Sequence, residues 1–196
     1  GANAADMLQL AESLELPDVV VLTPQARGGV WYPQPFTAPV QHNEPWLSSA
    51  LGVIAAQLER LEAAGIPAAR TGLLGFSQGA CLALEYAARH AQRYAGVFGL
   101  SGGLIGEPGR PRDVEALMDN TPVFLGCSDR DPYIPLALVE QTAAVFERLG
   151  ARVAVLTSAA ELPAVFDEHP AIEVCCHLSE ASTTFENIYE NGHRRQ

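Results

Sequence analysis

The chain has 196 residues, of which 48% are hydrophobic and 18% charged, and its 12 basic and 23 acidic residues give a formal charge of -11. This length and composition predict one globular domain with a hydrophobic core and exclude a disordered or fibrous chain. The negative charge argues against nucleic acid or an anionic membrane surface as a partner. We expect a soluble, cytoplasmic protein, because no apolar run is long enough for a membrane helix and residues 1–6 lack signal-peptide features.

Strand-like and helix-like segments alternate along the chain. Residues 18–23 form a β-branched run that predicts a buried strand, and residues 25–43 form a loop rich in glycine, proline and aromatic side chains. A helix is then expected to begin near Pro45 and to end before Gly65. Further strands are predicted at 69–76, 96–100, 121–127 and 151–156, and further helices at 77–90 and 136–149. This order predicts βαβ units, and therefore a mostly parallel sheet covered by helices.

The segment with the clearest chemical signal is Gly75-Phe76-Ser77-Gln78-Gly79, a G-x-S-x-G pattern between a predicted strand and a predicted helix. A serine on such a sharp turn adopts a strained backbone and presents its hydroxyl above the sheet. We expect both glycines to be required because a Cβ at either position would collide where strand and helix cross. The N–H of Gln78 is then one donor to an oxyanion. In the alternative interpretation, the glycines only form a tight turn and Ser77 caps the helix; the flanking elements favour the nucleophile.

A serine nucleophile needs a histidine base and a carboxylate that orients the histidine. Asp129 and Asp131 directly follow the predicted strand 121–127, at the sheet edge where catalytic groups of open α/β sheets collect. The alternative is an ordinary turn in which Asp129 pairs with Arg130 and Asp131 precedes a proline bend. Spacing alone does not choose between these interpretations, or between the two aspartates.

Residues 75–80 together with residues 126–135, Gly-Cys-Ser-Asp-Arg-Asp-Pro-Tyr-Ile-Pro, resemble the phospholipase/carboxylesterase family of α/β hydrolases, which includes the acyl-protein thioesterases. The resemblance extends over about residues 1–155 and is strongest to the bacterial branch. It implies a three-layer α/β-hydrolase sandwich, an ester-hydrolysing Ser-Asp-His triad and no cofactor or metal. It also implies that the acid is Asp131, the aspartate before the proline of the family's D-P-x-[IV]-P stretch.

Two departures from the family pattern concern the ends of the sequence. The family's H-G-x-G strand, whose loop supplies the second oxyanion donor, is absent, and residues 1–3 resemble the end of that loop, so an N-terminally truncated core is expected. Loss of one such donor typically lowers turnover by about 100- to 1000-fold. The exposed sheet edge would then need a cover, such as a second subunit or the chain's own C-terminal segment.

The second departure concerns the catalytic base, because the window where the family carries its histidine contains none. His169 is nearest by spacing, and His193 is the alternative because residues 188–193 resemble the family's turn. His177, beside Cys175 and Cys176, is interpreted as structural, and the alternative for each candidate base is a surface or satisfied histidine. His90, near the end of its predicted helix, is interpreted as structural, and His42 as a solvated loop residue that could instead border the pocket. The four cysteines show neither metal-ligand nor disulfide-framework spacing and predict unpaired thiols.

The sequence therefore predicts a single α/β-hydrolase domain over residues 1–196, with a family-like core at 1–155 and a divergent segment at 156–196. The expected activity is hydrolysis of small, largely neutral carboxylic esters or thioesters. Trp31, Tyr32 and Phe36 are candidates for the wall of an apolar substrate site; anchoring the loop onto the core is their equally good alternative. The competing functional hypothesis is a catalytically impaired hydrolase-fold protein that serves binding or assembly.

Overall fold

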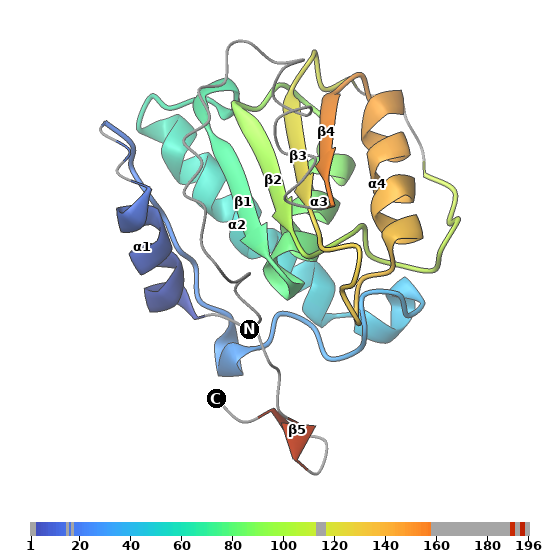
Figure 1. Cartoon of the computed structure of the whole chain (residues 1–196). Helices are drawn as coiled ribbons and strands as arrows, with labels where there is room; N and C mark the ends of the chain where they lie inside the picture. The colour runs from blue at the N-terminus through green and yellow to red at the C-terminus, as the bar shows by residue number, and fades with distance from the viewer. Residues whose placement is uncertain are drawn as a thin grey trace.

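The computed structural model describes residues 3–14, 16, 18–112 and 117–157, and the backbone of two short strands at 189–190 and 193–194. Its centre is a four-stranded sheet in the order β1-β2-β3-β4, with every neighbouring pair parallel (Figure 1). The strands are β1 (Gly72–Phe76), β2 (Gly96–Leu100), β3 (Pro122–Gly126) and β4 (Arg152–Leu156). Each lies within a segment predicted as a strand, so the parallel α/β prediction is confirmed. Two further strands, β5 (Tyr189–Glu190) and β6 (His193–Arg194), form an antiparallel pair.

Helices connect the strands as the sequence pattern predicts. The α-helices are α1 (Ala4–Ser13), α2 (Trp46–Ala63), α3 (Gln78–Arg89) and α4 (Leu136–Arg148). Short 3-10 helices are η1 (Arg27–Gly29), η2 (Val40–Asn43) and η3 (Ala68–Arg70). The turn η3 occupies the start of the predicted strand 69–76, so β1 begins only at Gly72. Among the α-helices of the described residues, only α1 has no counterpart in the prediction; its signal is a capping box in which Asn3 and Asp6 satisfy each other's backbone N–H groups.

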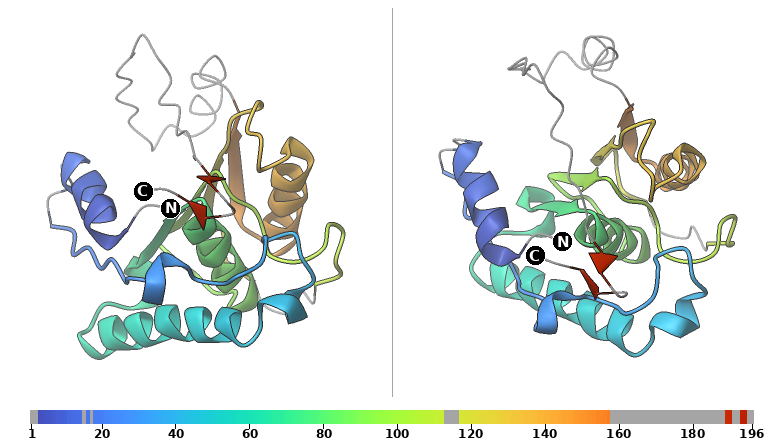
Figure 2. Two further views of the ribbon diagram at one scale, coloured as in Figure 1. Left: turned by 90° about the horizontal axis from the view of Figure 1, so that it is seen from below. Right: turned by 60° about the horizontal axis from the view of Figure 1, so that its bottom comes forward.

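The hydrophobic core lies between the sheet and one layer of helices. Helix α3 packs on β1 and β2, α4 packs on β3 and β4, and α2 lies outside α3 (Figure 2). Because side chains alternate along a strand, Val97, Val123 and Leu125 point to this layer and are at most 2% exposed. Phe98 points to the opposite face and is 38% exposed. One face of the sheet is therefore covered by helices, including the face of β1, the strand that leads to Ser77.

The prediction of a buried strand at residues 18–23 is wrong. This segment is not in the sheet, and the side chains of Val19, Val20, Val21 and Leu22 are 40–69% exposed. A β-branched run has high strand propensity, but a strand also requires a neighbour for its backbone hydrogen bonds. No backbone hydrogen bond within the described part of the chain joins 18–23 to β1.

Candidate active site

Ser77 lies on the tight connection between β1 and α3. Its backbone torsions, φ 53° and ψ -121°, are in a region that non-glycine residues rarely adopt and that costs about 1–3 kcal/mol. The turn is held by hydrogen bonds from Ser77 N to the Leu100 oxygen (2.8 Å) and from Cys81 N to the Ser77 oxygen (3.1 Å). The hydroxyl makes no helix-capping hydrogen bond. The predicted strained turn is therefore confirmed, whereas the capping interpretation of Ser77 is wrong.

The two glycines of the turn have different roles. A Cβ on Gly75 would lie 2.2 Å from the carbonyl oxygen of Gly79 and 2.5 Å from the nitrogen of Ala80. The absence of a side chain at Gly75 therefore lets the first turn of α3 lie directly on β1. A Cβ on Gly79 would have no atom within 4 Å, so the predicted collision at this position is wrong. The backbone of Gly79 packs against Gly75, while the space that a side chain on Gly79 would occupy is open.

Helix α3 begins at Gln78, so its N-terminus is directly beside Ser77. The N–H groups of a first helical turn have no partner inside the helix, and the helix dipole gives them a partial positive charge. The Gln78 N–H immediately follows the serine, where an oxyanion formed by attack of the Ser77 hydroxyl would need a donor.

The side chain of Gln78 makes a contact that the sequence did not predict. Its Oε1 accepts a hydrogen bond from the backbone N–H of Trp31 at 2.8 Å, and its Nε2 donates to the carbonyl oxygen of Tyr32 at 2.8 Å. The carboxamide thus binds the backbone of two consecutive residues of the aromatic-rich loop beside the nucleophile turn. The partners are 47 and 46 residues away in the sequence, and no local pattern signals such a pair.

The three aromatic residues of this loop have different environments. Tyr32 is 2% exposed and packs in the core with Leu47 and Leu82, and burial together with the neighbouring Cys81 raises the pKa of its phenol. This position matches the alternative in which Tyr32 anchors the loop. Trp31 and Phe36 lie at the border of the same cluster and are only half-buried, which leaves part of each ring accessible.

Of the two candidate acids, Asp131 has the more tightly held carboxylate. Its Oδ1 accepts backbone hydrogen bonds from Tyr133 (2.8 Å) and Ile134 (3.0 Å), and the residue is half-buried. The Cys127 thiol lies 3.8 Å from Oδ2. Asp129 is exposed, and among the described residues no ion pair joins it to Arg130.

The sheet brings Ser77 and Asp131 to the same edge. Ser77 follows β1, Asp131 follows β3, and β2 lies between these parallel strands. Two inter-strand spacings correspond to about 10 Å, a gap that an imidazole between the two side chains can bridge. The next strand, β4, ends at Leu156 on this same edge, and the oxygen of Thr157 accepts a hydrogen bond from the N–H of Asp129 at 3.1 Å.

The candidate histidine bases fall in the C-terminal part of the chain. His169 and His177, like Cys175 and Cys176, lie outside the described residues, and for His193 only the backbone is described, in β6 paired with Glu190. The remaining histidines have positions expected of surface residues. His42 is exposed, and His90 ends α3 with its ring stacked on Tyr86 at 4.4 Å.

The two thiols in the described part of the chain are buried and free. Burial raises the pKa of Cys81 to about 11 and that of Cys127 to about 12, so both are protonated at neutral pH. No group of three or more metal-ligating side chains occurs among the described residues. Nor does any described helix have the length and apolar character needed to cross a membrane.

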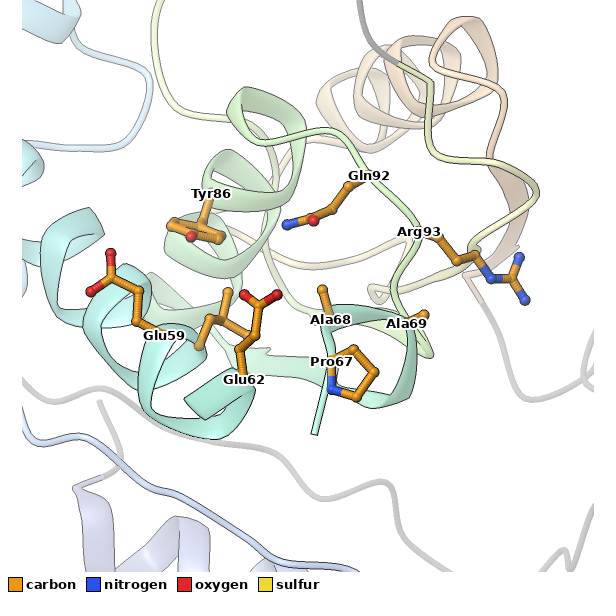
Figure 3. Close-up of a pocket in the computed structure, with 9 residues that line it drawn as sticks. Glu59, Glu62, Pro67, Ala68, Ala69, Tyr86, Gln92 and Arg93 are labelled. Carbon is orange, nitrogen blue, oxygen red and sulfur yellow. The ribbon is translucent and has the colours of Figure 1, made fainter. Parts of the chain in front are cut away.

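A separate hollow of about 380 Å³ lies between the end of α2, the turn η3 and the end of α3 (Figure 3). It is lined by Glu59, Glu62, Pro67, Tyr86 and neighbouring residues. These residues precede β1 and β2, whereas Ser77 and Asp131 follow β1 and β3, so the hollow is at the opposite end of the sheet. It is therefore not part of the candidate active site.

Comparison with known proteins agrees with this fold. The profile of the phospholipase/carboxylesterase family matches residues 20–161. A crystal structure of a phospholipase/carboxylesterase from Dyadobacter fermentans is 36% identical, with a TM-score of 0.77 over 85% of this chain and 84% of that chain. No curated protein matches the chain.

Two less similar crystal structures share the fold. Esterase PE8 is 23% identical, with a TM-score of 0.68 over 88% of each chain. The Bacillus cereus carboxylesterase is 17% identical, with a TM-score of 0.59 over 87% of this chain and 84% of that chain. The protein thus has an α/β-hydrolase fold and belongs to the phospholipase/carboxylesterase family of ester hydrolases.

Proposed function

We propose that the protein is a serine carboxylesterase in which Ser77 is the nucleophile. The observation that carries the proposal is the strained Ser77 backbone at the N-terminus of α3, where the hydroxyl makes no capping hydrogen bond and lies beside the first helix N–H groups. Asp131, fixed at the same sheet edge, has one carboxylate oxygen held by backbone N–H groups. Its other oxygen, which lies 3.8 Å from the Cys127 thiol, is the one that would orient a histidine, for which His169 is the first candidate and His193 the second.

In this mechanism, the histidine removes the Ser77 proton as the hydroxyl oxygen attacks the ester carbonyl. The negative charge that develops on the carbonyl oxygen is stabilised by the Gln78 N–H and the positive end of α3. The histidine returns the proton to the departing alcohol, which leaves an acyl group on Ser77. A water molecule, activated by the same histidine, then releases the carboxylic acid and restores the serine.

The surroundings of Ser77 favour small, largely neutral esters. The turn is contacted by Leu100, by Cys81 and by the Trp31–Tyr32 loop. None of these residues carries a positive charge that would bind an anionic substrate. The formal charge of -11 further disfavours anionic substrates. Thioesters of the same acyl groups react by the same acyl-enzyme chemistry and are included in the proposal.

Labelling with a fluorophosphonate probe tests the nucleophile. The wild-type protein and a Ser49→Ala control on the exposed surface of α2 are expected to be labelled, whereas Ser77→Ala is not. A folded wild-type protein that is not labelled would overturn the proposal. That result would support the alternative hypothesis of a hydrolase-fold protein that binds without catalysis.

Hydrolysis of p-nitrophenyl acetate and butyrate by His169→Ala and His193→Ala identifies the base. We expect one substitution to abolish measurable turnover and the other to leave it near the wild-type level. If neither substitution lowers turnover, both histidines are excluded and with them the proposed triad. The same measurements with the corresponding acetyl and butyryl thioesters test whether the protein also hydrolyses thioesters.

A further inference from the structure

The hydrogen bonds of the Gln78 carboxamide define how the aromatic loop meets the nucleophile turn. A carboxamide has one acceptor and one donor group, and here both bind the backbone of consecutive residues, Trp31 N–H and Tyr32 C=O, at 2.8 Å each. Gln78 is the residue next to Ser77 and the first residue of α3. The position of the Trp31 backbone is therefore tied to the turn through a single side chain.

The rest of the loop is supported from other points. Asn43, fully buried, accepts a hydrogen bond from Gln34 N and donates to the Pro35 oxygen, and Gly106 N donates to the Phe36 oxygen. These contacts hold the segment after residue 33. On the side of Trp31, the supports are the buried Tyr32 ring and the Gln78 carboxamide.

We propose that Gln78 is a positioning residue that holds Trp31 at the mouth of the acyl site and thereby sets the preference for acyl-chain length. The Trp31 ring is the half-buried aromatic group on the peptide that the carboxamide holds, while Tyr32 is committed to the core. Without the carboxamide, Trp31 N–H and Tyr32 C=O lose their partner and the loop can move away from the turn. This inference rests on the proposed esterase function, but the first test below measures the loop position without any enzyme activity.

The first test uses the fluorescence of Trp31. The chain contains two tryptophans, so Trp46→Phe leaves Trp31 as the only indole emitter. In that background, Gln78→Met removes both hydrogen bonds and nearly preserves side-chain volume. Loss of two hydrogen bonds of ordinary strength corresponds to roughly a 10-fold or larger change in the population of the held loop. We expect acrylamide quenching of Trp31 to increase at least about 2-fold, while the matched control Gln57→Met on α2 leaves it unchanged.

The second test measures selectivity on the protein that retains both tryptophans. We expect Gln78→Met to change the ratio of kcat/KM for butyrate to that for acetate by about 5- to 10-fold, in the same direction as Trp31→Ala. The double variant should show no larger change than Trp31→Ala alone, because both substitutions act through the same ring. A purely structural role would instead lower both kcat/KM values by one common factor.

The outcomes distinguish failure of the positioning role of Gln78 from failure of the proposed esterase function. Unchanged quenching of Trp31 in Gln78→Met overturns the positioning role, whatever the activity. Increased quenching with an unchanged butyrate-to-acetate ratio overturns the role in selectivity. If the wild-type protein hydrolyses neither ester, the proposed function fails and the selectivity claim fails with it, while the quenching measurement still decides whether Gln78 holds the loop.

Discussion

Substitution of Gly75 by alanine is the most direct perturbation of the nucleophile turn. The added methyl group would be 2.2 Å from the Gly79 oxygen, 2.4 Å from its carbonyl carbon and 2.5 Å from Ala80 N. All three contacts are with backbone, so no side chain can rotate away. To restore a contact of about 3.2 Å, the first turn of α3 must move by about 1 Å, and overpacking of this kind costs up to about 3 kcal/mol.

The expected consequences are measurable in two ways. For a protein of this length, a loss of about 3 kcal/mol lowers Tm by about 6–12 °C. Displacement of the Ser77 hydroxyl by about 1 Å should reduce the rate of fluorophosphonate labelling by about 100-fold. Thermal unfolding and timed labelling of the folded protein report the two effects separately.

The matched control is Gly79→Ala, four residues away in the same motif. Its methyl group meets nothing within 4 Å, and Gly79 has a helical rather than a left-handed backbone. Alanine should therefore stabilise the protein by about 0.4–1 kcal/mol by reducing the freedom of the unfolded chain. If Gly75→Ala were as stable and as rapidly labelled as wild type, or if Gly79→Ala were the more damaging variant, the steric account of the turn would be refuted.

Three further substitutions test other parts of the structure. Glu85 is completely buried and accepts arginine hydrogen bonds as short as 2.8 Å, so Glu85→Gln should lower the free energy of unfolding in urea by about 3 kcal/mol, whereas the exposed Glu59→Gln should change it little. Asp131→Asn keeps the oxygen that accepts two backbone hydrogen bonds, so we expect a stable fold with esterase activity reduced by about 10⁴-fold; unchanged activity would exclude this acid. Unfolded thiols lose their protons above about pH 9, but Cys81 and Cys127 keep theirs to about pH 11 and 12, so Tm should fall as the pH rises above 9. Cys81→Ala should make this fall shallower, and an identical slope would contradict the assigned burial effect.

The site was predictable where its requirements are local. A glycine before the nucleophile, a serine at a strand end and an apolar helix face after it are enough to specify the turn, because its backbone torsions and helix start depend on neighbouring residues. Identifying Asp131 needed more than local pattern. Spacing left it level with Asp129, and the preference came from family resemblance; the backbone hydrogen bonds to its Oδ1 become visible only in the fold.

The sequence by itself determined the order of strands and helices, because hydrophobic runs of five residues and helical periodicity express themselves within each element. Tertiary structure decided whether a run with strand propensity had a neighbour to pair with, which is why residues 18–23 remain outside the sheet. It also decided that the Gln78 carboxamide meets the Trp31 and Tyr32 peptide groups. Hydrogen bonds between residues far apart in the chain depend on how whole helices and strands pack together, and no single segment of the sequence determines that packing.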